Sequence, residues 1–322
     1  MPHAVGSRLP FQPAQPPIRR FRSPEGLPKD TGHEKGLGGV ENHSPNSNSP
    51  LGTKLLNFYK STLDKSRDFT KPYVCWFCSV NNGENEIVGS GLFFTVCEKY
   101  FCLTAKHVIE NRNKHDDFCI TTGEEAKLLI GIPKLIKKIY LSNNLLDIAF
   151  FEIPNALKTF ISNRHFLEIN RFEDILDKGD TPRTLIMTGY PHYRSISGSK
   201  TKKTIGVFTA FGTSSINKKP KSRFKQFSKK THISLMFSPE GNTYSGTDVA
   251  EPVMPEGFSG GPIWNIKAFE SKTNLWTTDK IKLCGITTTY YKQEKLVAGT
   301  SINEVVKFVL KKRPDLKDEL KI

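Results

Sequence analysis

A serine framed by glycines is the place where residue types and spacing first suggest chemistry. Ser259 lies in the stretch Pro255–Trp264 (PEGFSGGPIW), with Gly257 two residues before it and Gly260 and Gly261 directly after it. A serine hydroxyl is a poor nucleophile at neutral pH and needs a base, a group that orients the base, and donors for the oxyanion. The N–H groups of Gly257 and Ser259 could converge as an oxyanion hole, because glycine permits the backbone conformation that this requires.

A histidine and an aspartate upstream could supply the other two groups. His107 stands in YFCLTAKHVIEN, where a strand ends and a short helical turn begins, so a rigid element would project its imidazole. Asp147 stands at the head of the alternating run DIAFFEI, where a lone carboxylate needs a partner. Each residue alone is more often a surface, core or turn residue. In the order His107, Asp147, Ser259, we interpret the three as base, orienting acid and nucleophile.

Short β-rich runs separated by turn signals make up most of the chain from Tyr73 onward, and many short strands at this spacing predict an all-β sandwich or barrel. Apolar residues near helical spacing predict that the domain closes with a helix over Asn303–Lys312. The predicted strands are 73–80, 86–96, 100–105, 137–141, 147–153, 183–190, 204–211, 231–237, 261–266, 282–290 and 296–302.

These motifs, in this order, resemble the trypsin-like serine proteases with the chymotrypsin double β-barrel fold. The segment 257–262 (GFSGGP) matches the family's G-x-S-G-G-P signature, and 103–108 (LTAKHV) and 147–149 (DIA) resemble its histidine and aspartate segments. Weaker matches favour the bacterial branch of high-temperature-requirement proteases, here without the trailing PDZ domain. The weaker matches are 188–193 (TGYPHY), 285–290 (GITTTY) and 298–306 (AGTSINEVV).

The resemblance implies two antiparallel six-stranded β-barrels with a C-terminal helix, in a protease domain over 71–315. Barrel 1 would cover about 71–160 and barrel 2 about 180–303. It implies a serine endopeptidase that acts on protein or peptide substrates through an acyl-enzyme, with no cofactor or metal. Its specificity pocket would be formed by Val253, Thr288, Thr289 and Tyr290. Because no acid stands at the expected floor, Val253, we expect a small or medium apolar side chain to enter that pocket.

The chain departs from the family pattern at three positions near these motifs. Lys106 replaces an alanine before the histidine, and we expect its side chain to point to solvent. Phe258 stands where members activated by N-terminal cleavage carry an acid, so no such activation is expected. Val108 stands where secreted members carry a cysteine, which suits a disulfide-free protein.

Composition places limits on the class of protein. The chain has 322 residues, 37% of them hydrophobic, enough for the core of one large domain or two small ones. Its apolar runs are too short to span a bilayer, and no secretory signal is recognised near the N-terminus. We interpret the six cysteines as small buried residues in a reducing compartment, and expect a cytoplasmic protein. Cys75 and Cys78 have CxxC spacing, but a strand would point them to opposite faces.

The remaining features concern the tail and the charge. Residues 1–50 are rich in Pro, Gly, Ser and Asn and predict a disordered tail, followed over 51–70 by a linker or short docking helix. The net charge is +15, and much of it lies in Lys218–Lys230 (KKPKSRFKQFSKK), where Phe224 and Phe227 interleave with the basic residues. This basic segment is either a solvated loop or a dock for nucleic acid, an anionic membrane or an acidic substrate.

Two alternatives to a protease remain open. One is a catalytically inactive protein of the same fold that binds peptides or partners. The other is a nucleic-acid-binding module that uses the basic segment, but this alternative leaves the contexts of His107, Asp147 and Ser259 unexplained.

Overall fold

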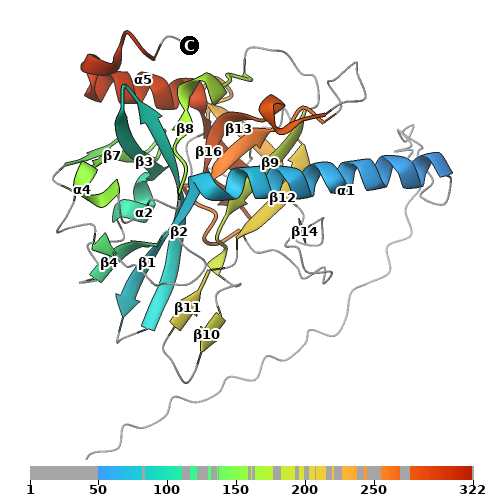
Figure 1. Ribbon diagram of the computed structural model, residues 1–322, viewed down its shortest axis with the longest axis horizontal. Helices are drawn as coiled ribbons and strands as arrows, with labels where there is room; N and C mark the ends of the chain where they lie inside the picture. The colour runs from blue at the N-terminus through green and yellow to red at the C-terminus, as the bar shows by residue number, and fades with distance from the viewer. Residues whose placement is uncertain are drawn as a thin grey trace, which may run out of the picture. The chain divides into compact units, whose positions relative to one another are not determined.

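The protein folds as two antiparallel β-sheets with helices at both ends of the folded part (Figure 1). The computed structural model describes residues 50–81, 84–110, 117–121, 130–131, 136, 138–158, 161, 164–176, 183–192, 196–198, 203–206, 208–214, 220, 227–237, 243–244, 255–268 and 276–320. The predicted tail over 1–50 lies outside these residues, apart from Pro50.

The first sheet runs in the order β5-β4-β1-β2-β3-β7-β6, and β8 adds to β2 in parallel. All its other pairs are antiparallel, as expected for strands joined by short connections. The strands are β1 (Val74–Asn81), β2 (Glu84–Val96), β3 (Lys99–Ala105), β4 (Asp117–Thr121), β5 (Ile130–Gly131), β6 (Ile139–Leu141), β7 (Ile148–Ile153) and β8 (Leu167–Glu168).

The second sheet runs in the order β13-β17-β16-β15-β9-β12-β14, and a separate two-stranded ribbon is formed by β10 and β11. The strands of the sheet are β9 (Thr184–Gly189), β12 (Thr209–Ser214), β13 (His232–Met236), β14 (Thr243–Tyr244), β15 (Pro262–Asn265), β16 (Lys282–Tyr291) and β17 (Leu296–Ser301). The ribbon pairs β10 (Ile196–Gly198) with β11 (Lys203–Ile205).

Both sheets follow the same winding of six principal strands. With the six strands of each sheet numbered in chain order, they lie in the order 4-1-2-3-6-5 in the first sheet and 3-6-5-4-1-2 in the second. Both orders result when a closed ring of strands in the order 1-2-3-6-5-4 is opened between two neighbouring strands. In the second sheet, the two ends of this path meet through a hydrogen bond of 2.5 Å from Thr213 Oγ1 on β12 to Met236 O on β13. This architecture confirms the predicted fold class of two antiparallel β-barrel units with a C-terminal helix. The short strands β5, β8 and β14 are additions to the six-strand pattern.

One hydrophobic cluster joins the two sheets and the C-terminal helix α5 (Ile302–Lys312). It contains Phe101 and Phe150 from the first sheet, Trp264 from the second, and Phe308 from α5. Helix α5 begins at the N-cap Ser301, whose hydroxyl accepts from the N–H of Glu304. Because the cluster draws on both sheets, burial of apolar surface holds them together.

The remaining helices precede the first strand, connect strands or follow α5. Residues expected as a linker or docking helix belong to α1, whose buried Thr62, Leu63, Ser66 and Thr70 lie along one face of the helix. The helices are α1 (Pro50–Thr70), α2 (Lys106–Glu110), α4 (Asn155–Lys158) and the short 3₁₀ segments η1 (Lys71–Tyr73), η4 (Ile169–Arg171), η6 (Thr278–Lys280) and η7 (Pro314–Leu316). None of the helices that the structure describes has the length and apolarity that crossing a membrane would require.

Two strand predictions were wrong in detail. The run 204–211 was expected to be one strand, but it contributes the end of β11 and the beginning of β12. Between them, Gly206 passes so close to Trp76 and Tyr190 that a Cβ would lie 3.0 Å from each ring. Strands β4, β5, β8, β10 and β14 were not predicted.

The cysteines are all free, and five of the six are buried. The exception is Cys97, which with Glu98 forms the two-residue turn between β2 and β3, both at positive φ. The interpretation of Cys97 as a buried residue was therefore wrong, because a hairpin tip faces solvent. Cys75 and Cys78 belong to different core clusters, as the alternation of a strand requires.

Candidate active site

Pairing of β3 with β7 brings His107 and Asp147 together. The register pairs Ala105 with Ile148, so the residues just beyond each strand end meet at one end of the sheet. Helix α2 begins directly after β3 and carries His107 in its first turn, while Asp147 comes directly before β7. The Lys106 N–H donates to Asp147 O at 2.9 Å and continues the ladder by one step.

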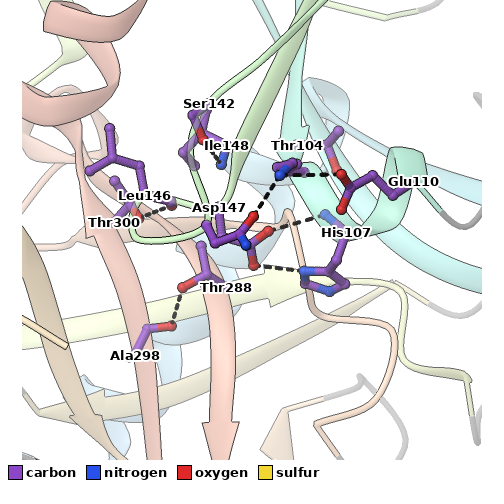
Figure 2. Close-up of polar contacts among 12 residues, drawn as sticks. Thr104, His107, Glu110, Ser142, Leu146, Asp147, Ile148, Thr288, Ala298 and Thr300 are labelled. Atoms are coloured by element: carbon purple, nitrogen blue, oxygen red, sulfur yellow. Dashed lines mark hydrogen bonds and ion pairs between the residues drawn. The ribbon is translucent and has the colours of Figure 1, made fainter. Parts of the chain in front are cut away.

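The carboxylate of Asp147 holds His107 in two places (Figure 2). Its Oδ2 lies 2.7 Å from His107 Nδ1, and its Oδ1 accepts from the His107 backbone N–H at 3.1 Å. An ionised carboxylate can only accept, so in neutral imidazole the proton sits on Nδ1 and Nε2 carries the free lone pair. The Asp147 side chain is 18% exposed and that of His107 is 40% exposed, so the acid is shielded while the imidazole remains open to solvent.

Asp147 ends a tight turn, Asn143–Asp147, which we call the Asp147 turn. Its φ of +52° is in the left-handed region, where aspartate is tolerated better than most residues. Asn143 accepts twice within the turn, through its backbone O from Asp147 N–H and through its Oδ1 from Leu146 N–H, both at 3.0 Å. Ser142 Oγ accepts from the N–H of Ile148 at 2.7 Å, which ties the turn to the first residue of β7.

The side chain of Lys106 does not point freely to solvent, contrary to expectation. Its Nζ donates to Asn144 Oδ1 at 2.6 Å and lies 3.2 Å from Glu110 Oε1, and the side chain is only 15% exposed. Lysine has a stem long enough to reach across to the Asp147 turn, and alanine at this position could not make these contacts. Lys106 therefore braces the turn that carries the acid.

The loop that carries Ser259 is attached to both sheets. From the first sheet, the Ser90 N–H donates to Ser259 O at 2.8 Å, and Ser90 Oγ donates to Gly257 O at 2.7 Å. From the second sheet, Thr287 O accepts from the Gly260 N–H at 2.7 Å. Gly260 has a φ of +84°, and a Cβ there would collide with the carbonyl of Ser90, so only glycine fits.

The peptide between Glu256 and Gly257 has a fixed orientation. Its carbonyl accepts from the N–H of His192 at 2.9 Å, and in a trans peptide the N–H points the opposite way. Gly257 has a φ of +92°, and a Cβ there would lie 2.6 Å from Tyr190 O. Among the described residues, neither the Gly257 N–H nor the Ser259 N–H has a hydrogen-bond partner. The oxyanion hole formed by these two N–H groups stays a prediction.

Phe258, the residue before the serine, is fully buried in the core of the second sheet with Met187 and Phe211. An aromatic side chain of this size anchors the loop by burial of apolar surface. Phe258, where the resemblance placed no acid, is thus a core residue.

A cavity of about 680 Å³ contains all three predicted catalytic residues in its lining. His107, Asp147 and Ser259 line it together with the predicted pocket residues Thr288, Thr289 and Tyr290. Among the described residues, no hydrogen bond joins the Ser259 hydroxyl to the His107 ring. Catalytic hydrogen bonds of this kind are often long before substrate binds. The predicted pocket floor, Val253, lies outside the described residues.

Two groups that line the cavity have shifted pKa values, the predicted pocket residue Tyr290 and a histidine that was not predicted, His232. Partial burial, and after it the Glu256 carboxylate, raises the pKa of the Tyr290 hydroxyl, so this phenol stays protonated near neutrality. His232, at the head of β13, lines the cavity and is almost fully buried. Burial lowers the pKa of its imidazole. No local motif marks His232 as part of the site, because the carbonyl that its Nε2 contacts, Leu145 O, belongs to a turn far away in the chain.

The site contains no cluster of metal-binding side chains within the described part of the chain. No group of three or more His, Cys, Asp or Glu residues there is arranged to hold an ion.

No protein-family model and no curated protein matches the chain. Similar solved structures include a Glu endopeptidase in complex with MPD, with 11% identity, a TM-score of 0.44, and coverage of 77% of this chain and 94% of that chain. A serine endoprotease from Yersinia pestis has 16% identity, a TM-score of 0.42, and coverage of 78% of this chain and 65% of that chain. An inactive mutant form of Rv3671c from Mycobacterium tuberculosis has 13% identity, a TM-score of 0.43, and coverage of 78% and 92%. Likenesses at this level assign no role to any residue, and the high-temperature-requirement branch stays a prediction.

Proposed function

We propose that the protein is a serine endopeptidase in which Ser259 is the nucleophile, His107 the general base and Asp147 the group that orients the base. One observation carries this proposal. The Asp147 carboxylate lies 2.7 Å from His107 Nδ1, and the imidazole and Ser259 line the same cavity. A carboxylate that engages Nδ1 leaves Nε2 as the proton acceptor, which a serine nucleophile requires.

The first half of the proposed reaction forms an acyl-enzyme. Ser259 Oγ attacks the carbonyl carbon of the scissile peptide while its proton passes to His107 Nε2. The new imidazolium is stabilised by Asp147, which stays ionised throughout. The oxyanion would accept from the N–H groups of Gly257 and Ser259. His107 then gives its proton to the leaving amine, and the C–N bond breaks.

The second half regenerates the enzyme. Water attacks the acyl carbon and gives a proton to His107 Nε2, which returns it to Ser259 Oγ as the carboxyl product leaves. Each proton transfer in this scheme uses a group of the chain itself.

Substrate selection would be set at the end of β16. Thr288, Thr289 and Tyr290 line the cavity beside Ser259, and the Tyr290 ring packs edge-on against the buried Phe237, with 5.3 Å between the ring centroids. A bulky aromatic ring fixed in this way limits pocket depth and favours small or medium apolar side chains. In a peptide library, Tyr290→Ala should broaden the preference toward larger apolar residues. Dominant cleavage after basic residues by the wild type would contradict this assignment.

The missing Ser259–His107 hydrogen bond favours one second candidate, an inactive protein of the same fold that binds peptides. Such a protein would keep the His107–Asp147 pair and the cavity without forming an activated serine.

A fluorophosphonate probe, which labels only activated serines, separates the two candidates. Wild type should be labelled, and both Ser259→Ala and His107→Ala should lose the label while remaining folded. Thr95→Ala serves as a matched control, because its hydroxyl bonds to Lys99 O at the far end of β2. A folded wild type that takes up no label would remove the endopeptidase proposal and direct attention to peptide binding.

A further inference from the structure

Three successive carbonyl groups of the Asp147 turn are each held by a different donor. The Asp147 carbonyl accepts from Lys106 N–H at 2.9 Å, within the first sheet. The carbonyl of Leu146 accepts from Thr300 Oγ1 at 2.5 Å, and that of Leu145 lies 2.9 Å from His232 Nε2. Thr300 and His232 both belong to the second sheet. The turn that carries the acid is therefore held from the opposite sheet as well as from its own.

The two donors from the second sheet stand side by side. His232 at the head of β13 and Thr300 near the end of β17 are direct cross-strand partners in the antiparallel register. Such partners project their side chains on the same face of a sheet, a spacing that suits two adjacent carbonyl groups of one turn. Figure 2 shows Thr300 reaching Leu146 beside Asp147.

A backbone carbonyl faces each ring nitrogen of His232: Leu145 O lies 2.9 Å from Nε2 and Ser228 O lies 3.2 Å from Nδ1. We assign the proton to Nε2, because its carbonyl contact is the shorter one and Nδ1 also faces two groups that can donate. Nδ1 then accepts from Thr231 Oγ1 at 2.8 Å and from the Ser228 N–H at 3.2 Å. The Phe227 ring stacks on the imidazole with 5.4 Å between centroids. Both ring nitrogens and one face of the ring are thus in contact, which fixes its orientation toward the turn.

We propose that His232 and Thr300 are positioning residues that hold the Asp147 turn from the second sheet and thereby align the Asp147 carboxylate with His107. The consequence for catalysis rests on the proposed endopeptidase function. A left-handed residue persists only where its surroundings hold it, and the φ of Asp147 is +52°. Removal of one donor leaves a carbonyl of the turn without its partner and lets the turn pivot about β7. His107 would then be misaligned, while the conformation of the loop that carries Ser259 would stay unchanged.

Thr300 gives the sharper test, because valine has the same shape without the hydroxyl and serine keeps the hydroxyl. Thr300→Val should lower kcat for a peptide ester by about 10- to 100-fold, the cost of a small misplacement of a catalytic group. KM should stay within about 2-fold, since Thr300 is not among the residues that line the cavity. Thr300→Ser should keep most of the activity. His232→Leu should reproduce the effect of Thr300→Val, and His232→Gln, which retains a donor, should recover part of it.

A second readout is independent of turnover. The proton between His107 Nδ1 and Asp147 Oδ2 should give a low-field proton resonance, assigned by its loss in His107→Ala. It should persist in Thr300→Ser and weaken or shift in Thr300→Val. Thr300→Val with wild-type kcat and an unchanged resonance would overturn the proposal, as would equal losses in Thr300→Val and Thr300→Ser. If the wild type shows no hydrolysis and no fluorophosphonate labelling, the endopeptidase proposal fails, and the resonance alone then decides the positioning role.

Discussion

Replacement of Ser90 by alanine should weaken both the fold and the site, because its hydroxyl joins three segments. Ser90 is fully buried on β2. Its Oγ donates to Gly257 O at 2.7 Å in the nucleophile loop and accepts from the N–H of Tyr190 at 2.9 Å after β9. Alanine keeps the backbone bond from Ser90 to Ser259 O and deletes only these two side-chain bonds.

The expected cost follows from the two groups left behind. A buried backbone donor or acceptor that loses its partner costs about 1–3 kcal/mol. The Tyr190 N–H and the Gly257 carbonyl both lose a bond, and the deleted hydroxyl no longer has to be desolvated. We therefore expect Ser90→Ala to lower the free energy of unfolding by about 2–4 kcal/mol. Since Gly257 is also a proposed oxyanion donor, kcat should fall by about 10- to 100-fold as well.

Urea denaturation of Ser90→Ala and of a control variant gives each change in the free energy of unfolding as a shift in the denaturation midpoint at constant slope. The matched control is Ser79→Ala on the neighbouring strand β1. Ser79 is equally buried, but among the described residues its hydroxyl has no hydrogen-bond partner. Ser79→Ala should be neutral or slightly stabilising. If Ser90→Ala destabilised the protein no more than Ser79→Ala does, the account of the loop attachment would be refuted.

Three further predictions concern charge, thiol exposure and the basic segment. Hydrogen bonds from Arg313 and, second, from Lys99 lower the pKa of the Asp315 carboxyl in the folded protein. The ionised carboxylate therefore stabilises the folded state at pH values above its unfolded-state pKa, and this stabilisation is lost as pH falls through the folded-state pKa. Asp315→Asn should therefore show a smaller drop in Tm than wild type between about pH 6 and about pH 3, and an equal drop would contradict this. Mild alkylation of the native protein should modify Cys97 alone, as read by mass spectrometry, whereas modification of the buried cysteines would not fit the structure. Replacement of the basic residues of Lys218–Lys230 by glutamine should weaken binding to single-stranded nucleic acid and flatten its salt dependence in fluorescence anisotropy; unchanged binding would leave this segment a solvated loop.

Much of the nucleophile loop was predictable because its requirements are local. The two residues of this loop that adopt a positive φ, Gly257 and Gly260, are both glycines. The strand predicted over 261–266 was also found, as β15 beginning at Pro262, since apolar pattern and φ restriction act over a few residues. The alternating runs around His107 and Asp147 likewise became β3 and β7.

The errors came where side chains meet partners far away in the chain. Lys106 was expected in solvent, but it reaches the Asp147 turn, which comes beside it only through the β3–β7 register. Cys97 was expected to be buried, but a two-residue hairpin turn exposes it. The run 204–211 was expected to be continuous, but the packing of Gly206 against Trp76 divides it.

The sequence by itself determined the residue types of the site, the glycines that shape the nucleophile loop, and the strand pattern of two β-units. These follow from backbone preference and apolar alternation, which are properties of neighbouring residues. Only the tertiary structure decided that His107 and Ser259 share one cavity and that His232 and Thr300 hold the turn before β7. Those contacts join the two sheets across long stretches of chain, and they depend on strand register and on how the shared hydrophobic cluster packs, neither of which any short segment encodes.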